Sequence, residues 1–219
     1  MGRAAAPRRG RPPVQGLRER RREQILTAAT RIFAQRGYPA TDLQVVADAI
    51  HAGKGTLYRY FPTKEALFLA AIERGILKLA QQVQSTVNEV EDPLARVAGA
   101  IGAYLDYFSR NPDMLELMAQ ERAVFKGRKP TYFAFLDTRL GPWRELFRRL
   151  MGQGRVRRMP FERIVDVMGD AVYGTIVTDY FSGRRRSPRE QSRDLLDIVF
   201  NGILTPAGRK TLDSLENPS

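Results

Sequence analysis

Apolar residues recur at helical spacing along most of the chain, and no segment alternates apolar and polar positions as a strand would. Between Leu17 and Gly37 the apolar positions follow the i, i+3, i+4, i+7, i+8 pattern of one helix face. These positions are Ile25, Ala28, Ala29, Ile32 and Phe33. Comparable segments continue to about residue 204. The pattern predicts an all-α protein of about nine helices.

Two short apolar segments lie close together after Gly37. The first is expected to begin at a capping box, Thr41 to Gln44. The second runs from Lys54 to Phe61 with Leu57 facing inward, and residues 51–53 form the joint between the two. Two short helices with a glycine in a joint of about three residues have the layout of a helix-turn-helix.

Proline and glycine divide the rest of the chain into longer helices. A helix is expected from Thr63 to about Glu91, and Asp92-Pro93 and Asn111-Pro112 each mark a new start. A further helical segment is expected to kink or break at Gly141-Pro142. We therefore predict a disordered basic arm (1–16), a helix-turn-helix head (17–65), and a helical body for effector binding and dimerisation (66–219).

The amino-acid composition excludes several classes of catalytic and metal-binding site. Among 219 residues there is no Cys and a single His, His51, so thiolate chemistry, disulfides and His-ligated metal sites are excluded. Glu116 and Glu121 are five residues apart and do not share a helix face, so they do not form an acid–base pair. No apolar run reaches the roughly 20 residues of a membrane span. We expect a soluble, cytoplasmic protein that is not an enzyme and needs no metal or other cofactor.

The net charge of +12 is unevenly distributed. Residues 1–65 carry 13 Lys and Arg against 5 Asp and Glu, while residues 66–219 carry 23 against 19. A basic end on a nearly balanced body suggests a polyanionic partner for that end. On charge alone, a solvated basic tail explains the excess equally well.

The segment Lys54–Phe61 has the residues that a helix needs to enter the major groove of DNA. Gly53 and Gly55 allow close approach, while Leu57 and Phe61 hold the helix to its neighbours. The donors available to phosphates or base edges are Lys54, Thr56, Tyr58, Arg59 and Tyr60. Periodicity alone would equally fit an ordinary pair of core helices.

The combined segment Thr41–Phe68 resembles the DNA-binding signature of the TetR family of transcriptional regulators, and KGTLYRYFPTKEAL is its most specific part. The resemblance implies a homodimer that binds a palindromic double-stranded DNA operator. It also implies phosphate or base contacts at Thr41, the start of the Lys54 helix, Thr56, Tyr58, Tyr60 and Lys64. Two residues depart from the family pattern. His51 replaces a common joint glycine but tolerates positive φ better than most residues, and Gly53 is a weak helix cap.

The arm adds a separate hypothesis. The segment from Arg8 to Pro13 resembles the core of an AT-hook, in which Arg9 and Arg11 would lie in a narrow A·T minor groove. The alternative is a flexible arm that adds only sequence-independent attraction.

Two helices of the body are apolar on more than one face, which predicts a four-helix dimer interface. Its expected residues are Val172, Ile176, Leu195, Val199 and Ile203. Aromatic residues are concentrated between positions 104 and 147 and suggest an apolar effector pocket, although core packing explains such a stripe more often. The candidate lining residues are Tyr104, Phe108, Met118, Phe125, Tyr132, Trp143, Phe147 and Tyr173.

Together these features predict a DNA-binding transcriptional regulator. We expect a repressor that a small lipophilic or aromatic effector releases from its operator. The alternative is a ligand-independent, DNA-bound adaptor that recruits a protein partner through the same body. The position of the operator would decide between repression and activation.

Overall fold

The computed structural model describes residues 14–184 and 186–201, and every regular element within them is a helix. This confirms the all-α prediction. Ten helices are present in the described part rather than nine, because α7 (Thr131–Asp137) and α8 (Gly141–Gly152) are separate. Pro142 lies in the first turn of α8, where its missing N–H breaks no helical hydrogen bond, so the expected kink is a complete break. No described helix is long and apolar enough to cross a membrane.

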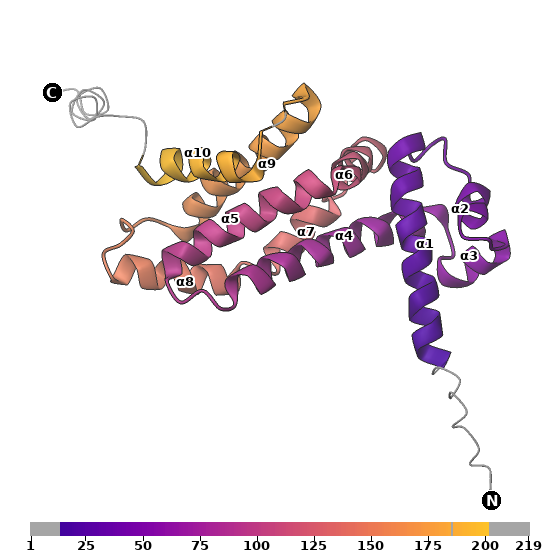
Figure 1. The fold of residues 1–219 in the computed structure, drawn as a ribbon, viewed down its shortest axis with the longest axis horizontal. Helices are drawn as coiled ribbons and strands as arrows, with labels where there is room; N and C mark the ends of the chain where they lie inside the picture. The colour runs from indigo at the N-terminus through magenta and orange to yellow at the C-terminus, as the bar shows by residue number, and fades with distance from the viewer. Residues whose placement is uncertain (1–13, 185, 202–219) are drawn as a thin grey trace, which may run out of the picture. The chain divides into compact units, whose positions relative to one another are not determined.

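The described residues form two compact units, residues 14–75 with 116–132, and residues 76–115 with the described residues from 133 to 201. The first contains α1 (Val14–Arg36), α2 (Leu43–Ala49), α3 (Lys54–Tyr60), the beginning of α4 (Lys64–Val87) and most of α6 (Pro112–Val124) (Figure 1). The part of the chain between residues 116 and 132, which the sequence assigns to the body, therefore lies with the head.

The core of the first unit is built from the apolar stripe of α1. Ile25, Ala29 and Phe33 are fully buried, as the spacing predicts. The Phe33 ring packs edge-on against Phe68 of α4 at 5.0 Å between centroids. Burial of a large apolar side chain such as Ile25 or Phe33 contributes about 1.5–3 kcal/mol. Gly37, at φ +78°, ends α1 in the left-handed conformation that favours glycine.

The second unit is organised around α5 (Pro93–Arg110), which contacts α8, α9 (Phe161–Ser182) and α10 (Pro188–Asn201). Its start is confirmed, since Asp92 accepts a hydrogen bond from the backbone N–H of Ala95 at 2.9 Å and Pro93 opens the first turn. The predicted cap of α10 is also confirmed. Ser187 and Glu190 bond reciprocally to each other's backbone N–H at 3.0 and 3.2 Å.

Candidate nucleic-acid interface

The helix α3 exposes polar residues over two buried anchors. Leu57 is inaccessible to solvent and Phe61, just after the helix, is 4% exposed. Gly53, Gly55, Tyr58 and Arg59 are exposed, and Lys54, Thr56 and Tyr60 are half-buried. A short helix that is anchored in the core by Leu57 and Phe61, with polar groups and glycines on its outer side, has the geometry for lying in a DNA groove.

The two glycines at the start of α3 have no packing role within the chain. A Cβ built on Gly53 or Gly55 would meet no atom within 4 Å. Neither residue has a positive φ. Glycine weakens a helix by up to about 1 kcal/mol relative to alanine, so these positions fit a surface that another molecule approaches closely. Gly53 offers no side-chain cap to α3, as expected.

His51, in the joint between α2 and α3, has the positive φ that we expected there. This residue has φ +50°, the left-handed value predicted for the position. Its backbone N–H donates to the carbonyl of Asp48 at 3.0 Å, which closes the turn after α2. The joint therefore forms without a glycine at position 51.

The predicted cap of α2 is wrong by one residue. Asp42, not Thr41, is the N-cap, and its carboxylate accepts from the backbone N–H of Gln44 at 2.8 Å. Thr41 is 2% exposed, and its hydroxyl donates to the Gly37 carbonyl at 2.7 Å. Thr41 therefore joins α2 to the end of α1, and its side chain is not available to DNA in this structure.

Asp42 is the residue of this surface that the sequence reasoning missed. Its carboxylate Oδ1 also accepts from Lys54 Nζ at 2.8 Å, although the two residues are twelve positions apart. The hydrogen bonds from Gln44 and then from Lys54 lower the pKa of Asp42, and the bond to Asp42 raises the pKa of Lys54. Asp is as good an N-cap as Thr, and this preference was the signal available in the sequence.

Lys64, at the start of α4, is held by the loop between α1 and α2. Its Nζ donates to the Pro39 carbonyl at 3.1 Å and lies 4.7 Å from the centre of the Tyr38 ring. Burial is the main cause of a raised pKa at Tyr38, which keeps this ring neutral. Arg9 and Arg11 lie outside the described residues, so their role in the minor groove stays a prediction.

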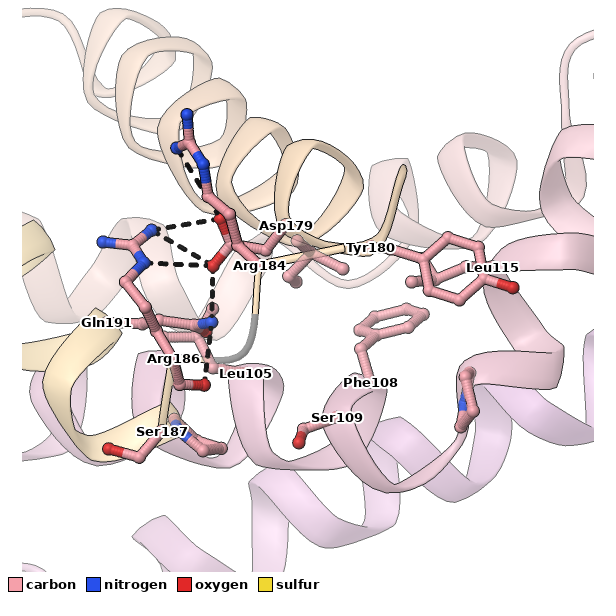
Figure 2. Close-up of a pocket in the computed structure, with 13 residues that line it drawn as sticks. Leu105, Phe108, Ser109, Leu115, Asp179, Tyr180, Arg184, Arg186, Ser187 and Gln191 are labelled. Carbon is pink, nitrogen blue, oxygen red and sulfur yellow. Dashed lines mark hydrogen bonds and ion pairs between the residues drawn. The ribbon is translucent and has the colours of Figure 1, made fainter. Parts of the chain in front are cut away.

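A separate pocket of about 460 Å³ lies in the second unit among α5, the start of α6, and the connection from α9 to α10. Figure 2 shows its charged end, where Asp179 accepts from Arg186 and Gln191 at 3.2 and 2.7 Å. Arg184 lies 4.0 Å from the same carboxylate and is largely exposed. The remaining wall is mainly apolar and includes Leu105, Phe108, Leu115, Ile176 and Tyr180.

The eight predicted effector residues do not gather around this pocket. Phe108 lines it, and the other seven do not. Met118, Phe125 and Tyr132 belong to the first unit. There Phe125 packs against Tyr38 at 5.3 Å between ring centroids, so it is a core residue. The residues that the structure places in the second unit are Tyr104, Phe108, Trp143, Phe147 and Tyr173.

Three of the five predicted dimer residues of α9 and α10 are buried within the second unit. Val172, Ile176 and Leu195 are no more than 8% exposed, because they pack inside the unit. Val199 is half-buried, and Ile203 lies outside the described residues. The apolar side chains that these helices leave exposed are Val167, Phe181, Ile198 and Phe200.

The head of the chain is the part that matches a known protein family. Residues 25–71 match the family described as bacterial regulatory proteins, tetR family. The transcriptional activator FasR of Mycolicibacterium smegmatis is 32% identical over 107 residues, 49% of each chain. The transcriptional repressor KstR of Mycobacterium tuberculosis is 32% identical over 100 residues, 46% of each chain. The chain thus spans about half the length of the curated relatives it matches.

Solved structures extend the similarity of fold to most of the chain. The TetR family regulator PfmR of Thermus thermophilus superposes with a TM-score of 0.67 at 23% identity, over 83% of this chain and 99% of that one. FadR of Bacillus subtilis, solved in complex with stearoyl-CoA, gives 0.69 at 16% identity, over 83% and 99%. These four proteins are all transcriptional regulators.

Proposed function

The chain belongs to the TetR family of bacterial regulatory proteins, and on this premise we propose that it is a homodimeric, sequence-specific DNA-binding repressor released by a small lipophilic effector. The observation that carries the proposal is α3. It presents Lys54, Thr56, Tyr58 and Arg59 outward over the buried Leu57. Phosphate contacts would position the helix, and base-edge contacts would read the sequence.

Selection of duplexes from a random oligonucleotide pool tests the DNA-binding proposal. The full-length protein should enrich a palindrome whose half-site centres lie about 34–36 Å apart. The double variant K54Q/Y58A should lose this enrichment, because it removes one phosphate donor and one exposed aromatic donor. K126Q, which changes an exposed lysine after α6, is the matched control and should retain it. Absence of any enriched sequence with the wild-type protein would refute the proposal.

The exposed apolar residues of α9 and α10 support a homodimer. Val167, Gly174 and Phe181 recur every seven residues along α9, so they lie near one face of the helix. Phe181 and Val167 are 62% and 60% exposed. Gly174 has no atom within 4 Å of a built Cβ, which leaves room for a second helix to approach. A second copy of the chain is the occupant we propose for this face.

The pocket of the second unit supports an effector with an apolar body and an anionic head. Ile176 is part of the apolar wall. Figure 2 shows Phe108 on that wall and Arg184 at the charged end of the pocket. Arg186 and Gln191 donate hydrogen bonds to the Asp179 carboxylate. Arg184 lies farther from that carboxylate, at 4.0 Å, and is 61% exposed, so an anionic head group would compete with Asp179 for Arg184. The stearoyl-CoA bound by FadR of B. subtilis has this general chemistry. An effector that prefers the DNA-free arrangement by about 1–3 kcal/mol would give useful control.

Matched amphiphiles test the effector proposal. Dodecanoate should bind the purified protein, raise its melting temperature and weaken DNA binding, whereas dodecanol and dodecyltrimethylammonium should act much more weakly. R184Q should lose the preference for the anion, while R163Q, at an exposed position in the first turn of α9, should keep it. If no amphiphile binds and native mass spectrometry finds no retained small molecule, the adaptor alternative replaces the effector proposal without affecting the DNA-binding one.

A further inference from the structure

A negative charge lies beside the first residue of the proposed recognition helix. Asp42 Oδ1 lies 2.8 Å from Lys54 Nζ, and the exposed fractions of the two side chains are 62% and 39%. The pair thus faces solvent on the surface that we propose binds DNA. A carboxylate at this place opposes the approach of phosphate.

The charge of Asp42 is not required for the local structure. As the N-cap of α2, the residue needs only a side-chain oxygen to accept from the Gln44 N–H. Asn and Ser supply that oxygen as well as Asp does. An exposed ion pair such as Asp42–Lys54 contributes little to stability. Neither the cap nor the ion pair therefore accounts for a carboxylate on a surface meant for a polyanion.

We propose that Asp42 is a brake on phosphate binding, which holds the Lys54 ammonium in an internal ion pair that a DNA phosphate must displace. The inference rests on the proposed function of α3 and goes beyond it. Lys54 has one ammonium group, so pairing with Asp42 competes with pairing to phosphate. The brake lowers the affinity of each head for any duplex, whatever its sequence, because phosphate contacts dominate sequence-independent binding.

Competition between Asp42 and phosphate for Lys54 makes release from DNA easier. A head that binds all DNA less tightly is more readily released, because an effector then has less binding free energy to overcome. The base-edge contacts that we propose for Thr56 and Tyr58 do not use the Lys54 ammonium that Asp42 holds. The residue thus sets the strength of phosphate binding separately from the reading of sequence.

D42N in the full-length protein tests the brake, because Asn keeps the helix cap and removes only the charge. We measure affinity for a 30-base-pair duplex of mixed sequence over a range of salt concentrations. D42N should bind about fivefold more tightly near 0.1 M salt, the scale of one exposed ion pair. Its slope of log K against log salt should steepen by about 0.9 for each additional phosphate that the protein neutralises.

D48N is the matched control. Asp48 lies at the other end of α2 and accepts from the Gln44 side chain, so D48N makes the same change in net charge on the same helix. Its affinity should change much less. Equal tightening in D48N and D42N would overturn the proposal in favour of a net-charge effect. Weaker binding by D42N would also overturn it, because Asp42 would then be positioning Lys54 rather than restraining it.

The double variant K54Q/D42N separates this inference from the proposed function. K54Q alone should weaken binding, and adding D42N to it should produce no more tightening than D48N does. If K54Q binds the duplex as tightly as the wild-type protein, the placement of α3 on DNA fails. If K54Q weakens binding but D42N does not strengthen it, only the brake fails. Circular dichroism melts confirm that each variant is folded.

Discussion

The side-chain amide of Gln120 donates a hydrogen bond to the backbone carbonyl of Phe33 at 3.0 Å, so a residue of α6 closes the C-terminal end of α1. The same amide accepts from the backbone N–H of Tyr38 at 2.8 Å. One side chain therefore satisfies a helix-end carbonyl and a loop N–H that lie more than 80 positions away in the sequence. This contact ties α6 to the head within the first unit.

We expect Q120A to lower the free energy of unfolding by about 1–3 kcal/mol, because it leaves the partly buried N–H of Tyr38 unpaired. The Phe33 carbonyl keeps its hydrogen bond from the Gly37 N–H at 2.9 Å. Chemical denaturation monitored by circular dichroism measures the change. Q81A, at an exposed position on α4, should change stability by less than about 0.5 kcal/mol. A loss in Q120A no larger than in Q81A would show that water replaces both hydrogen bonds.

Substitution of Gly55 should change stability and DNA affinity in opposite directions. G55A should stabilise the fold by up to about 1 kcal/mol, since alanine is the better helix former and its methyl group meets no atom of the chain. The same substitution should weaken binding to the selected operator, because the methyl group lies where the duplex approaches. Thermal melts and fluorescence anisotropy measure the two effects. G99A in α5, whose Cβ would lie 3.8 Å from Thr86 and Val87, should leave DNA affinity unchanged.

The two faces of α9 should respond differently to substitution. F181E places a charge on the proposed dimer face and should yield a monomer at micromolar concentration in sedimentation velocity, with little loss of protomer stability. I176A should cost about 2–5 kcal/mol of folding free energy, because Ile176 is buried within the unit. L77E, at an exposed apolar position on α4, controls for the added charge. A dimeric F181E protein would remove this face from the interface.

The capping box of α10 should make stability depend on pH in the acid range. The pKa of Glu190 lies below its ordinary value, first because of the Ser187 backbone N–H and then because of the Ser187 hydroxyl. Arg193 and Arg186 act in the same direction. Its stabilising contribution is therefore fully present above the unfolded-state pKa of about 4.3 and is lost as pH falls through the lower folded-state value.

E190Q isolates this effect, because Gln can still complete a capping box without a titrating group. The difference in melting temperature between the wild-type protein and E190Q should be constant from pH 7 to about 5 and should shrink toward pH 3. A difference that does not vary over this range would contradict the assignment.

Local patterns determined much of this structure in advance. The spacing of Ile25, Ala29 and Phe33 predicted which face of α1 is buried, and Asp92-Pro93 predicted where α5 begins. The residues of α3 predicted its buried anchor and its outer polar face. These features depend on interactions within a few positions along the chain, so the order of residues alone specifies them.

Only the tertiary structure decided the relations between distant residues. The residues of α9 form two apolar faces, and their order does not say which face packs on α5, so Val172 and Ile176 were assigned to the dimer interface although they lie in the core. Nor does the order of residues show that Gln120 reaches Phe33, that Thr41 is buried, or that Lys54 pairs with Asp42. Periodicity fixes a helix and its faces, whereas the partner of each face depends on how separate helices pack in three dimensions.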